Sequence, residues 1–191
     1  FDYLSRFELT QISPERDAVL AEMNALMRGF RENYLQTARD YAEAGCLEEA
    51  VAVLDQCGDG YPMLAYYRAY YLKGMGEAEK AAEECRRADT CSPLYCFPNK
   101  LEDIAVLECA AELYPEGSMA YYYLGDLYYD KLQFERAVRL WEDAAARRPD
   151  FPTVHRNLAL AYYNKQGEAE KARAEMEKAF ALDESDARVF L

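Results

Sequence analysis

Apolar side chains recur along this chain at the spacing of one face of an α-helix. Within residues 118–149 they fall three or four positions apart in two groups: Tyr121, Leu124 and Tyr128, then Ala137, Trp141 and Ala144. Pro149 closes the second group, because proline cannot continue a helix interior. The 9 glycines and 7 prolines of the chain fall mostly where such helices would end. The pattern therefore predicts helices joined by short connections and not a strand-and-turn fold.

This arrangement repeats with a period of about 34 residues. The next copy carries Leu158, Ala159, Tyr162, Ala172, Met176 and Ala179, with one residue inserted before Gly167. An upstream copy carries Tyr34, Ala38, Tyr41, Gly45, Ala50, Leu54 and Cys57. A further copy lies within 61–88, where the aromatic and alanine positions from Tyr66 to Tyr71 allow two registers. Because a single helix pair cannot bury its apolar face alone, the copies must stack.

The spacing resembles the tetratricopeptide repeat (TPR), whose pattern is W-x2-L-G-x2-Y, then A-x3-F, then P. Leu124-Gly125, Tyr128 and Ala137 take their places in it, and Trp141 replaces the phenylalanine. The resemblance implies an all-α fold, a right-handed α-solenoid of stacked antiparallel helix pairs. Gly125 and Ala137 are expected where the two helices of one pair cross closely. The segments expected within this single solenoid, 1–191, are a degenerate repeat at 1–30, repeats at 31–60 and 61–88, an irregular loop plus helix at 89–117, repeats at 118–151 and 152–184, and the start of a truncated repeat at 185–191.

Two of these segments depart from the pattern. In 1–30, Ser13 and Pro14 predict the start of a second helix ending at Met27, with the first helix degraded into 1–9. In 89–100, two prolines predict an ordered loop in place of a first helix. The chain starts at Phe1 and stops inside a helical pattern, so we expect it to be a piece of a longer protein.

Three stretches, CFPNKLEDIAVLE, YYYLGDLYYDK and NLALAYYNKQGEAEKA, resemble the helical tails of large uncharacterised bacterial proteins. In those proteins the tail follows a β-rich domain related to mutarotase-like folds. The resemblance implies an intramolecular scaffold within a carbohydrate-related protein, as an alternative to a module that binds other proteins.

The net charge of −13 is spread over the chain and offers no basic stripe. Nucleic acid and anionic membranes are therefore not expected as partners. No apolar run approaches the roughly 20 residues that a bilayer-spanning helix needs. We expect a cytoplasmic protein whose cysteines are reduced.

Catalytic, metal and cofactor chemistry was sought without result. His155 is the one histidine and is expected to be a packing residue. The six cysteines match no ligand spacing, and Cys91 and Cys96 are five positions apart. Carboxylate pairs such as Glu48-Glu49 and Glu83-Glu84 suit solvated helix faces. The sequence therefore predicts no enzyme, no metal site and no cofactor.

The 17 tyrosines carry the one hint of a binding surface. A second helical stripe lies beside the packed one, and its counterpart recurs one repeat later: Met119, Tyr122, Asp126 and Tyr129, then Arg156, Leu160 and Tyr163. In stacked repeats the first helices line the concave groove, so this stripe is expected to bind a protein or peptide partner. The alternative, that these side chains pack between repeats, fits the sequence equally well.

Some TPR domains grip the C-terminal carboxylate of a chaperone with Lys, Asn and Arg in the groove. Here the corresponding places carry Leu35 and Arg39, Tyr122 and Asp126, then Thr153 and Asn157. The paired Lys and Asn are missing, and Asp126 would repel a carboxylate. We therefore expect no binding of acidic C-terminal tails.

Overall fold

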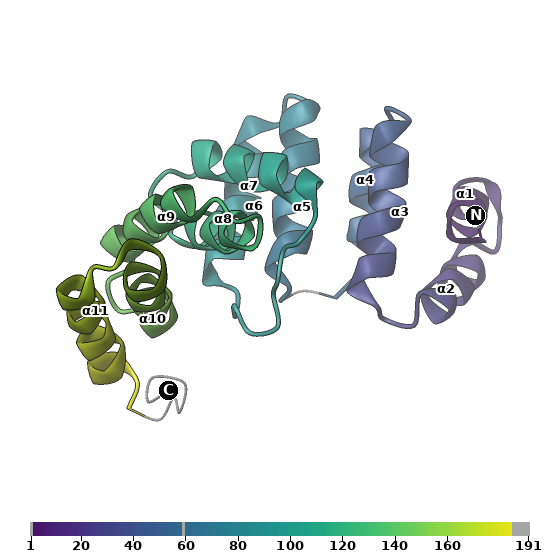
Figure 1. The fold of residues 1–191 in the computed structure, drawn as a ribbon. Coiled ribbons are helices and arrows are strands. Elements are labelled where there is room, and N and C mark those ends of the chain that lie inside the picture. The colour runs from purple at the N-terminus through teal and green to yellow at the C-terminus, as the bar shows by residue number, and fades with distance from the viewer. Residues whose placement is uncertain (1, 59, 185–191) are drawn as a thin grey trace. The chain divides into compact units, whose positions relative to one another are not determined.

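The structure is a computed structural model that describes residues 2–58 and 60–184. Throughout these residues the regular structure is helical, and no strand occurs among them. The chain divides into two compact units, Phe1–Pro93 and Leu94–Leu191. Figure 1 traces the helices of each unit in chain order. Among the described helices, none combines the length and the apolar character that crossing a bilayer would require.

The first unit holds three consecutive helix pairs. They are α1 (Asp2–Ile12) with α2 (Arg16–Met27), α3 (Arg31–Glu43) with α4 (Leu47–Leu54), and α5 (Pro62–Gly74) with α6 (Ala78–Thr90). The first pair differs from the expectation of a degraded first helix, because α1 is a full helix. Its Phe7 ring packs against Tyr41 of α3, with the ring centroids 5.5 Å apart. Ser13 lies in the turn before α2, where its hydroxyl accepts a hydrogen bond from the Glu15 amide.

Helix α5 is buried on almost all sides, which explains why its sequence allowed two registers. Tyr66 and Tyr67 are both in the core, while Tyr70 lies at the surface. Arg68 is also buried, and its guanidinium donates to Asp55 Oδ1 at 2.8 Å and to the Leu54 carbonyl at 2.7 Å. A buried charge is tolerated there because it is paired and hydrogen-bonded.

The second unit begins with an irregular segment, which includes a turn at Leu94 and Tyr95, followed by α7 (Leu101–Leu113). Residues alternate along this segment: Cys96 and Pro98 are buried, whereas Tyr95 and Phe97 are exposed. The start of α7 is closed by Asp103, whose Oδ2 accepts hydrogen bonds from the amides of Asn99 and Lys100, both at 3.0 Å. The segment thus stands in place of a first helix.

Two complete pairs follow in the second unit. They are α8 (Met119–Asp130) with α9 (Phe134–Arg147), and α10 (Pro152–Ala161) with α11 (Ala169–Leu182). Between α10 and α11, residues Tyr162–Gln166 form one turn of π-helix. Helix α9 packs against both α8 and α10, so the two pairs share a core.

The turns between paired helices explain that π-helix. In three pairs the turn closes with an amide bonded to the carbonyl five residues earlier: Cys46 to Tyr41 (2.9 Å), Glu77 to Leu72 (2.9 Å) and Gln133 to Tyr128 (2.8 Å). In the last pair Glu168 reaches Tyr162, six residues earlier, at 3.0 Å. The residue inserted before Gly167 is therefore absorbed as a widened helical turn, and the closing contact survives.

Candidate functional site

A cavity of about 280 Å³ opens on the second unit where α8, α9 and α10 meet. We call it the α8–α10 cavity; its walls are Asp126, Tyr129, Asp130, Trp141, Asn157 and Leu160. The helical repeat places them together. The three lining residues from α8 are spaced i, i+3, i+4, and the two from α10 are spaced i, i+3. Each set therefore lies on one face of its helix. Trp141 reaches the cavity from α9.

Asp126 is the most constrained polar group of the cavity. Its Oδ1 accepts from Trp141 Nε1 at 3.0 Å and from Asn157 Nδ2 at 3.2 Å. The Tyr122 hydroxyl is a further donor to this carboxylate. Burial raises the pKa of Asp126 to about 7, and these donors together with nearby Arg156 only partly oppose that rise. A carboxylate held by neutral donors in a low-dielectric setting is incompletely compensated when it is ionised.

Aromatic rings form a row beside this carboxylate. Tyr129 packs against Trp141 with centroids 5.2 Å apart and against Phe134 with centroids 4.9 Å apart. The Lys165 ammonium lies 4.3 Å from the centre of the Phe134 ring. The row gives the cavity a rigid apolar wall, because each ring is held by its neighbour.

The seven residues predicted from the sequence to face a groove differ in how exposed they are. Asp126, Tyr129 and Leu160 line the α8–α10 cavity, and Tyr163 lies at the surface with 67% of its area exposed. Arg156 is half-buried and donates to Asn157 Oδ1 at 3.0 Å. Two others differ from the expectation of an open face and belong to the core: Met119 (0% exposed) and Tyr122 (8% exposed).

The loop between α9 and α10 is the cause of that burial. Phe151 packs edge-on against Tyr122, with the ring centroids 4.9 Å apart. Arg148 Nη1 lies 3.7 Å from the Met119 sulfur. These two side chains cover the N-terminal half of the predicted stripe, so only its C-terminal half, Asp126 and Tyr129, reaches the cavity.

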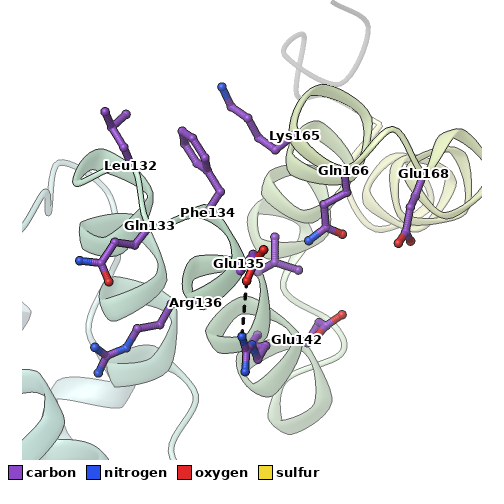
Figure 2. A pocket seen from close by; sticks show the side chains of 11 residues that line it. Leu132, Gln133, Phe134, Glu135, Arg136, Glu142, Lys165, Gln166 and Glu168 are labelled. Carbon is purple, nitrogen blue, oxygen red and sulfur yellow. Dashed lines mark ion pairs between the residues drawn. The ribbon is translucent and has the colours of Figure 1, made fainter.

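A second hollow, of about 820 Å³, lies beside the turns of the two pairs of the second unit. We call it the turn pocket. Figure 2 shows Leu132, Phe134 and Lys165 at one end of it, with Gln166 and Glu168 on the side of the π-helix. The Glu135 and Arg139 side chains approach within 3.9 Å along its α9 wall. The pocket is lined by both acidic and basic side chains, so its charge favours neither an anionic nor a cationic ligand.

Sequence reasoning missed the turn pocket. Leu132, one of its lining residues, could have drawn attention to this turn because the equivalent position is glycine in the other pairs. Leu132 has a φ of 61° at the turn position that Gly45, Gly76 and Gly167 occupy in the other pairs. Such a backbone favours glycine, and a leucine there is strained. The leucine is also 73% exposed, so burial does not offset the strain.

Among the described residues, no group of three or more His, Cys, Asp or Glu side chains is arranged to hold a metal ion. His155 is buried between α10 and α11, with Nδ1 2.6 Å from Glu175 Oε2 and Nε2 2.9 Å from the Pro149 carbonyl oxygen. Both ring nitrogens are thus engaged in structural contacts.

One part of the chain matches a known family model. Residues 125–166 match the family model of the TPR repeat. The chain is also similar to the crystal structure of MamA, with 18% identity, a TM-score of 0.46, and coverage of 90% of this chain and 88% of that one. A MamA structure from residue 41 to the end, from Desulfovibrio magneticus RS-1, has 18% identity, a TM-score of 0.41, and coverage of 82% and 97%.

Proposed function

We propose that this chain is a non-catalytic protein-interaction module of the cytoplasm that binds a peptide segment of a partner on the second unit. The binding surface is the α8–α10 cavity together with Tyr163. TPR repeats commonly serve as protein-interaction modules, and the family match covers the helices that form this cavity.

One observation carries the proposal: the first helices of two successive pairs present their side chains to one cavity. Asp126 and Tyr129 come from α8, and Asn157 and Leu160 come from α10. An extended peptide that crosses successive first helices would contact both sets. Leu160 on the cavity wall and Tyr163 at the surface offer exposed apolar and aromatic area, which suits an interface that forms and dissociates.

Selection from a displayed random peptide library tests the proposal. We expect the wild-type chain to enrich peptides whose binding is weakened at least tenfold by Leu160→Ser and by Tyr163→Ala. Both side chains are exposed, so neither change should lower the melting temperature much. Binding is measured by calorimetry with the enriched peptides.

Leu182→Ser is the matched control, because Leu182 is 43% exposed on α11 and Leu160 is 42% exposed on α10. The control variant should bind as the wild type does. If the enriched peptides bind Leu160→Ser and Tyr163→Ala undiminished, the surface lies elsewhere. If repeated selections enrich nothing, the chain is not a peptide-binding module.

A second candidate, a helical scaffold that packs on a neighbouring domain of a larger carbohydrate-related protein, is supported by the segment before α7. Four large apolar side chains are exposed in this segment and at the first residue of α7: Leu94, Tyr95, Phe97 and Leu101. Contiguous exposed apolar area of this kind often marks an interface. In a longer chain that includes the neighbouring domain, amide exchange over 94–101 should slow relative to the 191-residue chain. Unchanged exchange would count against this candidate.

A further inference from the structure

The walls of the α8–α10 cavity combine two carboxylates, two aromatic rings, one carboxamide and one aliphatic side chain. Asp126 is half-buried, whereas Asp130 stands at the exposed end of α8. Tyr129 and Trp141 form the ring wall, and Leu160 of α10 completes it. A ligand that fills the cavity must satisfy negative charge and apolar area together.

The Asp126 carboxylate still has capacity to accept hydrogen bonds. Trp141 and Asn157 both donate to its Oδ1, and Tyr122 is the third donor. An ionised carboxylate offers about four acceptor positions. All three donors are neutral, so they fix the orientation of the carboxylate without cancelling its charge.

The cations around the cavity leave that charge largely uncompensated. Arg156 donates to Asn157 Oδ1, and its positive charge lowers the pKa of Asp126 without offsetting the effect of burial. Lys131 pairs with Asp130 Oδ2 at 2.8 Å, on the exposed side. The Asp130 carboxylate keeps a second oxygen, and the pair itself is weak because solvent screens it.

We propose that the α8–α10 cavity binds the side chain of a lysine from a partner polypeptide. The ammonium group lies between Asp126 and Asp130, and the aliphatic stem lies along Leu160 and the Tyr129 ring. An ammonium has three donors, which suits two carboxylates that each have oxygen lone pairs to spare. The rings add attraction for a cation. This inference rests on the proposed function, since it names the chemistry of the partner at the same site.

Other ligand classes fit less well. An anionic group would meet two carboxylates and a chain of net charge −13, which repels it. A purely apolar side chain would displace water from Asp126 and leave its charge buried without a counter-ion. A lysine-bearing segment is instead attracted by the negative charge of the whole chain, which speeds its association.

The proton of Asp126 is linked to this binding. Its charged and titratable neighbours are Tyr122, Tyr129 and Asp130 on α8 and Arg156 on α10, and α9 contributes the neutral Trp141. Because the pKa of Asp126 is about 7, lysine binding should strengthen as pH rises through that value and the carboxylate ionises.

Fluorescence of Trp141 tests the proposal directly, because it is the only tryptophan of the chain and lines the cavity. The probes are two capped pentapeptides, one with lysine between alanines and one with acetyl-lysine in its place, at millimolar concentration. The lysine peptide should shift the emission saturably and bind about tenfold more tightly than the acetyl-lysine peptide. The difference should vanish in Asp126→Asn, which keeps an acceptor oxygen for Trp141.

Asp150→Asn is the matched control, since it removes the same unit charge from an exposed loop residue, 79% accessible at its side chain. It should keep the preference and its rise between about pH 5.5 and pH 8.5. A preference below tenfold, a preference that survives in Asp126→Asn, or no saturable shift at all overturns the lysine assignment. The library selection tests the proposed function separately. If the enriched peptides depend on Leu160 but share no lysine position, the chain is a peptide-binding module and the lysine assignment is wrong.

Discussion

The Cα of Gly125 on α8 lies directly against the indole ring of Trp141 on α9. A Cβ placed on Gly125 would stand 2.3 Å from Cδ1 and 2.4 Å from Nε1 of that ring. The indole is itself fixed, because its Nε1 donates to the Tyr122 carbonyl at 3.2 Å and to Asp126 at 3.0 Å. The close helix crossing expected at Gly125 is therefore a contact between backbone and ring.

Gly125→Ala should destabilise the chain by about 1–3 kcal/mol, because the new methyl group must displace the indole. The gain of up to about 1 kcal/mol that alanine brings to a helix does not offset this. Thermal and urea unfolding measure the change, with Gly58→Ala as the control, since a Cβ there meets nothing within 4 Å. Equal melting of the two variants would show that the crossing has room to relax.

Leu132→Gly should stabilise the chain by about 0.5–1 kcal/mol. It removes the strain of a leucine at a φ of 61°, roughly 1–2 kcal/mol, against the entropy cost of a glycine. The reverse change, Gly76→Leu, should destabilise, since Gly76 has a φ of 83°. Gln133→Gly, from the same turn at a φ of −92°, should lose stability and serves as the control for added flexibility.

Asp126→Asn should raise stability in neutral solution. The pKa of Asp126 is raised by burial to about 7 in the folded chain, above its unfolded value near 3.8. Folding is thus favoured while the group is protonated, and this contribution is lost as pH rises from about 4 through 7. The advantage of the variant should be near zero at pH 4 and on the order of 4 kcal/mol at pH 8. Asp150→Asn should show no such slope; a flat difference for Asp126→Asn would contradict the expectation.

Glu175→Gln should weaken the last helix pair. The carboxylate accepts from His155 Nδ1 at 2.6 Å and from Lys178 Nζ at 2.7 Å. Burial alone would raise the pKa of Glu175, but these hydrogen bonds and charges outweigh it and lower the pKa below 4.5. Its contribution is therefore present above about pH 4.5 and lost as pH falls through the folded value. We expect a cost of about 1–2 kcal/mol at pH 7 that shrinks toward pH 3 in thermal melts.

Acidic C-terminal peptides should not bind. The α8–α10 cavity presents Asp126 and Asp130, and its one amide donor, Asn157 Nδ2, is already engaged by Asp126. Calorimetry with a peptide that ends in acidic residues should show no heat of binding in low salt, where any attraction would be strongest. Measurable affinity for such a peptide would contradict the inference that this surface repels carboxylates.

Much of the fold was predictable because the repeat depends on local steric requirements that particular residue types meet. Gly125 and Ala137 mark the helix crossing by their size, and Pro149 marks the helix end by its missing donor. The inserted residue before Gly167 was also visible from the spacing alone. The helix at 2–12 was not, because its apolar positions match no copy of the repeat and its partner Tyr41 is distant in sequence.

The candidate site was predictable only in part, for a different reason. Helical spacing identifies which residues share a face, and it placed Asp126, Tyr129 and Leu160 together. Helical spacing does not predict which side chains of a neighbouring loop cover that face. Phe151 covers Tyr122 and Arg148 covers Met119. The loop sequence has no periodicity from which these contacts could be predicted.

The π-helix at Tyr162–Gln166 has a consequence for how such a chain diversifies. Tyr129 and Tyr163 occupy equivalent places in successive pairs, yet Tyr129 stacks on Trp141 while Tyr163 projects outward. A single inserted residue widens the turn that contains Tyr163, while the amide of Glu168 still donates to the Tyr162 carbonyl. The closure of a helix pair thus tolerates the insertion of one residue, so the turn of a single repeat can lengthen while its two helices stay paired.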